Sequence, residues 1–327
     1  MLSYLLDRLR GRYARLDEQD IERAIDIVVE QTDPRLRFVR GFRRKLRKPV
    51  VRSLVYVDDL VTRIPGPFEI SRKAYGSDPQ VNALFGSADD IETLFARSKM
   101  LQEFFRDTPG CGRVCVPLAM QRQEKRILGM ALSGDIVRRD VVRTAVNFSG
   151  HRLGIVCAEN EAELRSKLKW RGIHSLAVTA LENITSLKTR TAGLEEERAL
   201  LGKKLRDVQA QHSGLDALAG LPSEYSQEQQ AIKQRLEDTG KKLQEARTGV
   251  ATLVDYLDQV CQVLNHPSRY LRVRRNSVTV DRMGIKLDGM SHEQGGEVFS
   301  ATLTMGTQPE FEIILAAFQR SGMAAAP

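Results

Sequence analysis

The chain has 327 residues, of which 42% are hydrophobic and 28% are charged, and its formal net charge is +8 at pH 7. This length gives room for two or three domains, and the hydrophobic content excludes an intrinsically disordered chain. The positive charge favours an anionic partner, but it does not specify whether that partner is nucleic acid, lipid or protein.

Cysteine usage and hydropathy bear on the compartment. The four cysteines are sparse, and they fit reduced thiols better than a disulfide framework. No run of about 18 apolar residues occurs, so no membrane-spanning helix is expected. Residues 1–15 carry scattered charges and lack the apolar core of a signal peptide. We therefore expect a cytoplasmic protein.

Residues 1–108 are predicted to form a helical domain, because apolar residues recur at helical spacing along this region. Its most charged segment is a basic amphipathic helix predicted at 34–48, with Pro34 in its first turn. No acid occurs between Asp33 and Asp58. The candidate anion-binding residues of this helix are Arg40, Arg43, Arg44, Lys45, Arg47 and Lys48.

A basic amphipathic helix suits a nucleic-acid backbone, an anionic membrane surface or an acidic protein groove. Only Phe38 and Phe42 are interleaved with the cations, so base stacking on a single strand has little support. The alternative is a solvated face whose arginines pair with carboxylates elsewhere in the chain. The acids considered for this pairing are Asp58, Asp59, Asp89 and Asp90.

The apolar period changes at residues 110–158, where alternating and β-branched runs predict four antiparallel strands. The breaks between strands are placed at 123–125, 133–135 and 149–151, and His151 is interpreted as a turn residue. The spacing of Cys111 and Cys115 does not match the usual zinc knuckle, so no metal site is predicted.

Residues 159–267 are predicted to form a long antiparallel coiled-coil hairpin. Mostly apolar residues recur at alternating gaps of four and three along 173–212 and again along 225–264. This period keeps one seam of each helix facing its partner. The expected register places Arg198 opposite Thr239 in one polar layer. The same seam fits an intramolecular hairpin or a swapped homodimer.

The link between the two arms, at 213–223, is the predicted tip of the hairpin. Gly214 can end the first helix, and Pro222 precedes the second. Apolar residues in the link either close the end of the coiled coil or form an exposed knob for a protein partner. These candidate partner-binding residues are Leu215, Leu218 and Leu221.

Short strands are predicted again at 268–318. Because the two arms are expected to be antiparallel, 110–158 and 268–318 are predicted to form one split antiparallel β domain. Residues 319–327 are predicted to be a disordered tail. A second cluster of candidate anion-binding residues consists of Arg272, Arg274 and Arg275.

The predicted fold is therefore α+β and mostly helical, with an N-terminal helical region and a small antiparallel β domain that the hairpin interrupts. No nucleophile elbow, phosphate-binding glycine loop or zinc motif occurs, so no catalytic residue, metal or cofactor is predicted. An enzyme is the least supported class, although a site assembled from distant residues leaves no such trace.

We expect a non-enzymatic coiled-coil interaction protein, serving as an adaptor, a scaffold or a subunit of a cytoplasmic assembly. Its basic surface would hold an anionic partner. Two alternatives use the same helix at 34–48: a nucleic-acid-binding protein, and a peripheral membrane-binding protein attached to anionic lipid.

Overall fold

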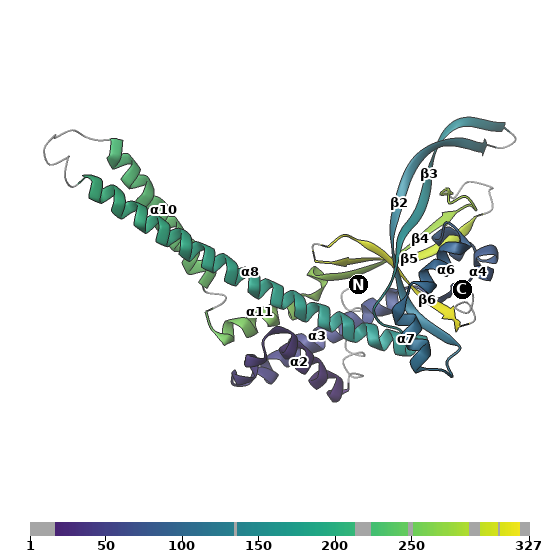
Figure 1. Cartoon of the computed structure of the whole chain (residues 1–327), viewed down its shortest axis with the longest axis horizontal. Coiled ribbons are helices and arrows are strands. Elements are labelled where there is room, and N and C mark those ends of the chain that lie inside the picture. The colour runs from purple at the N-terminus through teal and green to yellow at the C-terminus, as the bar shows by residue number, and fades with distance from the viewer. Residues whose placement is uncertain are drawn as a thin grey trace, which may run out of the picture. The chain divides into compact units, whose positions relative to one another are not determined.

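The computed structural model describes residues 17–133, 136–212, 224–247, 251–287, 295–306 and 308–320. The chain divides into two compact units. Of the described residues, the sheet unit comprises those within 53–173 and 266–320, and the helical unit comprises those within 17–52 and 174–265. The mostly helical α+β fold predicted from the sequence is confirmed (Figure 1).

One sheet contains strands from both sides of the long helical insertion. Its order is β3-β2-β6-β5-β4, all neighbours are antiparallel, and β1 pairs in parallel with β6. The strands are β1 (Phe68–Glu69), β2 (Arg113–Ser133), β3 (Ile136–Leu153), β4 (Leu271–Val280), β5 (Gly296–Met305) and β6 (Phe311–Gln319). Segments far apart in sequence therefore share a single core.

A short segment after β4 joins the two edges of this sheet. Leu287 N donates to Thr279 O at 2.9 Å on the β4 side, and Lys286 N donates to Thr144 O at 2.8 Å on the β3 side. These backbone bonds satisfy edge groups that would otherwise stay open. The sheet is consequently curled, and apolar side chains fill its interior.

Four short helices pack against the sheet: α4 (Arg72–Ser77), α5 (Pro79–Leu84), α6 (Ala88–Ala96) and α7 (Lys99–Asp107). Phe95 of α6 meets Phe318 of β6 edge-on, with 3.8 Å between ring centroids. Ser87 is the N-cap of α6, and its side chain accepts the Asp90 backbone N–H. The C-terminal end of α3 (Phe42–Arg63) and the first turns of α8 (Glu161–His212) complete the sheet unit.

The predicted breaks at 123–125 and 149–151 are wrong, because β2 and β3 are two long strands. Gln121 pairs with Ser149 and Ala119 with Arg152, so Gly150 and His151 form an irregularity inside β3 rather than a turn. Gly150 has a φ of +64°, which a β-bulge can absorb without ending the strand. His151 is half-buried and stacks on Phe85.

The prediction of one basic helix at 34–48 is also wrong in its bounds. The segment contains a 3-10 turn, η1 (Pro34–Phe38), then a left-handed Gly41 at φ +74°, and then the start of α3 at Phe42. Helix α3 continues through Pro49 to Arg63. Proline lacks the N–H that would bond the Lys45 carbonyl, and Cys261 Sγ lies 3.9 Å from that oxygen.

The helical unit also contains α2 (Glu18–Thr32), α10 (Glu224–Arg247), α11 (Leu253–Asn265) and most of α8. Helices α8 and α10 run antiparallel (Figure 1), joined by a buried cluster of Leu201, Val208 and Ile232. Ion pairs flank this cluster: Glu195 with Arg247 at 2.5 Å, Glu197 with Arg235 at 3.7 Å, and Lys204 with Glu228 at 3.4 Å.

Two details of the predicted seam differ from the structure. Thr239 is buried, whereas Arg198 is exposed, so these residues do not form a buried polar layer. The second arm is two helices, and Thr252 starts the second of them in a capping box with Asp255.

No helix among the described residues is long and apolar enough to cross a membrane.

Candidate functional site

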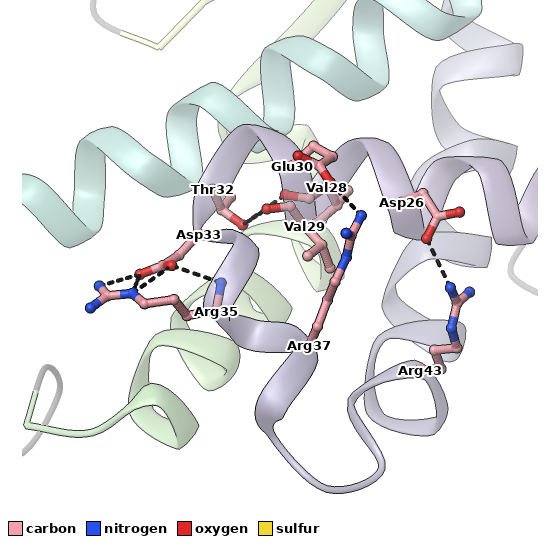
Figure 2. A network of polar contacts seen from close by, with 9 residues as sticks. All are labelled: Asp26, Val28, Val29, Glu30, Thr32, Asp33, Arg35, Arg37 and Arg43. Atoms are coloured by element: carbon pink, nitrogen blue, oxygen red, sulfur yellow. Dashed lines mark hydrogen bonds and ion pairs between the residues drawn. The ribbon is translucent and has the colours of Figure 1, made fainter.

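The basic segment at 34–48 faces an acidic row on α2. Four carboxylates recur at every fourth residue of α2 and so lie along one side of the helix: Glu18, Glu22, Asp26 and Glu30. Arg43 pairs with both Glu22 and Asp26, the latter at 3.0 Å, and Arg37 pairs with Glu30. Figure 2 shows the Asp26 and Glu30 pairs.

Asp33 holds the connection between α2 and η1. Its carboxylate accepts the Arg35 backbone N–H at 3.0 Å and forms an ion pair with the Arg35 guanidinium at 2.7 Å (Figure 2). The hydrogen bond from Arg35 lowers the pKa of Asp33, and the same contact raises the pKa of Arg35. The capped turn directs the chain back along α2, which brings the cations of α3 to the acidic row.

Two more of the predicted anion-binding residues form ion pairs within the protein. Arg47 pairs with Glu18, and its hydrogen bond lowers the pKa of that carboxyl. Lys45 Nζ lies 3.7 Å from Asp258 of α11. The alternative in which the cations pair with acids elsewhere therefore applies to Arg43, Lys45 and Arg47. The acids are not those expected from the sequence, since Asp59 pairs with Arg63 and Asp89 with Arg72.

Three predicted residues make no ion pair with any carboxylate in the described ranges: Arg40, Arg44 and Lys48. All three are exposed. Arg44 and Lys48 are four residues apart on α3, so their side chains project from the same side of the helix. We call these three residues the open basic surface.

Three apolar residues of this segment are not available to a partner, because Leu36, Leu46 and Val50 are fully buried in the protein. Val39 and Phe42 are half-buried. Phe38 has 83% of its surface exposed at the end of η1. The segment therefore presents cations and one phenyl ring, but no continuous apolar stripe.

The second predicted cluster lies on β4 in the sheet unit. Arg274 pairs with Thr302, and Thr302 pairs with Glu312, so these three residues form one row across β4, β5 and β6. Directly paired residues of an antiparallel sheet share a face. Arg272, Arg274 and Arg275 are all exposed.

Glu312 is the centre of a hydrogen-bond network in this row. Its carboxylate accepts from Ser300 Oγ at 2.6 Å, from Thr302 Oγ1 at 2.9 Å and from Asn276 Nδ2 at 3.2 Å. Asn276 Nδ2 also donates to Thr302 Oγ1 at 2.6 Å. Only 7% of Glu312 is exposed, and all three donors are neutral.

A groove of about 770 Å³ opens over this network. Its floor contains Thr302 and Glu312, and its sides are formed by β2 and β4. The remaining lining residues are Arg122, Glu124, Arg274, Arg275, Asn276, Ser277, Glu310 and Phe311. Such a volume is in the range of small-ligand sites, although this lining is more polar than most.

The other residues predicted from the sequence add nothing to these two sites. Leu215, Leu218 and Leu221 lie outside the described residues. Within the described ranges, no group of three or more His, Cys, Asp or Glu side chains is placed to hold a metal ion. Sequence reasoning missed the acidic row on α2, which its spacing of four could have revealed. It also missed Glu312, a single carboxylate in the apolar segment 311–318.

Comparison with models of known protein families, with curated proteins and with solved structures found no match. The function must therefore be inferred from the contacts and charges of the chain itself.

Proposed function

We propose that this chain is a non-enzymatic interaction protein, an adaptor or scaffold, whose open basic surface holds an acidic segment of a protein partner. The observation that supports this proposal is that carboxylates neutralise some of the cations of α3 and leave others without a partner among the described residues. Arg43 and Arg47 already bind carboxylates of α2, whereas Arg44 and Lys48, each one residue further on, are exposed without such partners.

The contact between α2 and α3 suggests what the partner looks like. Arg43 and Arg47 are four residues apart and bind carboxylates that also recur every four residues. Arg44 and Lys48 have the same spacing, so a second acidic helix would match them in the same way. Phe38, an exposed aromatic residue near these cations in sequence, is a suitable anchor for an interface.

The number of open cations argues against duplex nucleic acid. Proteins that bind duplexes tightly neutralise roughly 6–10 phosphates, whereas this surface offers Arg40, Arg44 and Lys48. The burial of Leu36, Leu46 and Val50 argues against an interfacial membrane helix, because such a helix inserts its apolar face into lipid.

We further propose that α8 and α10 form an antiparallel coiled coil that provides a second contact element, with the predicted tip at Leu215, Leu218 and Leu221. The buried Leu201, Val208 and Ile232 and the flanking ion pairs support this packing. The four free cysteines support a reducing, cytoplasmic compartment. In a swapped homodimer, a second copy would supply one of the two helices.

The test uses fluorescence polarisation with a labelled alanine-based helix that carries glutamate at every fourth position. A glutamine version of the peptide, a labelled DNA duplex and vesicles with or without phosphatidylserine serve as comparison probes. We expect the glutamate peptide to bind at low salt and to weaken as salt rises. We expect the glutamine version, the duplex and the vesicles to bind more weakly.

The variant Arg44→Glu/Lys48→Glu should lose at least about tenfold in affinity for the glutamate peptide. The matched control is Lys99→Glu/Arg106→Glu, which makes the same charge change at exposed residues of α7. Tighter binding of the duplex than of the peptide would favour the nucleic-acid alternative. Equal loss in both variants would show that net charge, and not this surface, drives binding.

A further inference from the structure

The groove over Glu312 contains a buried carboxylate that forms no ion pair with a cation of the described chain. The donors to the carboxylate are the hydroxyls of Ser300 and Thr302 and the amide of Asn276. Removing a carboxylate from water is costly unless a cation or several donors compensate it. Neutral donors satisfy its hydrogen bonds, but they leave its net charge in place.

Most other charges of the groove are compensated or solvated. Arg122 pairs with Glu124, and the Arg275 guanidinium lies 5.8 Å from the centroid of the Phe299 ring. Glu310 is exposed and accepts from Thr304 Oγ1 at 2.9 Å.

Arg274 and Arg275 both line the groove, and neither forms an ion pair with a carboxylate that the structure describes. Only Arg274 lies in the same row of the sheet as Glu312. The groove therefore presents one buried carboxylate without an ion pair, Glu312, and one cation without an ion pair in its row, Arg274.

The sheet sets the separation between the Cα atoms of these two residues. Arg274 and Glu312 lie in one row with Thr302 between them, which makes them two strands apart. Strands are about 4.8 Å apart, so the two Cα atoms are separated by about 9.6 Å. An extended tripeptide measures about 10 Å between its charged ends, since each residue spans about 3.4 Å.

We propose that this groove binds a short peptide as a zwitterion, with its N-terminal ammonium at Glu312 and its C-terminal carboxylate at Arg274. Asn276, Ser277 and Thr302 supply polar side chains along the path of the peptide backbone. The volume of about 770 Å³ leaves room for peptide side chains. This site belongs to the sheet unit and does not rest on the function proposed for the open basic surface.

Isothermal titration calorimetry with trialanine tests the proposal on the full chain. We expect saturable binding of trialanine, and at least about tenfold weaker binding of N-acetyl-trialanine and of trialanine amide. Each blocked peptide lacks one of the two charges. Free alanine should also bind at least about tenfold more weakly, because it cannot reach both Glu312 and Arg274.

Two variants connect the binding to the residues. Glu312→Gln and Arg274→Gln should each weaken trialanine binding at least about tenfold, and Arg152→Gln, at an exposed residue of β3 that does not line the groove, should not. Because Glu312→Gln alters a buried network, its fold is checked by circular dichroism. The exposed Arg274 keeps the test decisive if that variant unfolds.

Three results would overturn the proposal. One is the absence of binding heat with trialanine up to about 10 mM, the weak end of ligand affinities. Another is equal affinity for the blocked and unblocked peptides. The third is an affinity for trialanine that Arg274→Gln leaves unchanged.

Discussion

The guanidinium of Arg165 binds the C-terminal end of α3, with Nη2 3.1 Å from the carbonyl oxygen of Ile64. A second bond from Nη2 reaches Gly66 O at 3.2 Å, and Nη1 donates to Val61 O. The last carbonyls of a helix have no partner within the helix, and a side chain from another element can satisfy them. Glu161 Oε1 orients the guanidinium by accepting from Nε at 2.7 Å.

Replacement of Arg165 by alanine should therefore destabilise the sheet unit. A hydrogen bond to a charged group is worth about 1.5–3 kcal/mol. This substitution removes one donor from each of three carbonyls, and Val61 O keeps its bond from the Ile64 backbone N–H. We expect the free energy of unfolding in urea to fall by at least about 2 kcal/mol. Arg171→Ala, at an exposed position of the same helix, is the control and should change stability little. Equal effects of the two substitutions would refute this role for Arg165.

The ion pairs between α2 and α3 should contribute modestly to stability. Arg43 and its partners Glu22 and Asp26 are each more than a third exposed, and exposed pairs are worth about 0.2–1 kcal/mol. A double-mutant cycle with Glu22→Gln and Arg43→Gln should give a coupling in this range that declines in high salt. The same cycle with Glu22 and the neighbouring Arg44 should give no coupling. A coupling shared by both arginines would contradict the pairing in the structure.

Stability should depend on pH through His151. Burial against Phe85 lowers the pKa of His151 below its usual 6.5, and Nε2 lies 2.8 Å from Leu84 O. The unfolded chain binds this proton more readily than the folded one, so its contribution is complete above pH 6.5 and is lost as the pH falls below that value.

Urea unfolding at pH 7.5 and pH 5.5 measures this effect. We expect His151→Gln to reduce the difference in unfolding free energy between the two pH values, because the variant has no imidazole to protonate. The same substitution at the exposed His266 serves as the control. If the variant His151→Gln shows the same difference in unfolding free energy between the two pH values as the wild type, other groups cause the effect.

Cys261 should resist alkylation in the folded protein. Burial raises the pKa of its thiol to about 11, so at pH 8 only about one thiol in a thousand is ionised. The thiolate is the form that reacts with iodoacetamide. Mass spectrometry after brief treatment at pH 8 should find Cys261 unmodified in the native protein and modified in urea. Rapid modification of native Cys261 would show that it is accessible and ionised.

The regular parts of the fold could be predicted from local patterns. Leu201, Leu243 and Leu257 occupy positions of the predicted helical seam, and all three are buried. Spacing alone identifies such positions because a helix repeats every 3.6 residues wherever it packs. Ser87 likewise caps α6 as its local sequence indicates. The coiled-coil packing of the seam itself stays a prediction.

Two glycines show where local patterns were insufficient. Gly41 and Gly150 both have positive φ values, of +74° and +64°. Gly41 separates η1 from α3 and divides the basic segment that the sequence predicted as one helix. Gly150 leaves β3 intact, since β2 continues to pair with β3 on both sides of it. Cross-strand pairing, which a single segment does not reveal, decides whether such a glycine ends an element.

The mixed α+β class, the long helices and the accumulation of cations at 34–48 could be predicted from periodicity and composition, because both are local properties. Which of those cations remain open depends on how the helices pack in three dimensions. The tertiary structure placed the acidic row of α2 against Arg43 and Arg47 and left Arg44 and Lys48 exposed. It also brought Arg274 and Glu312 into one row from strands far apart in the chain. Coulomb interactions depend on distance in space, and sequence separation does not encode that distance.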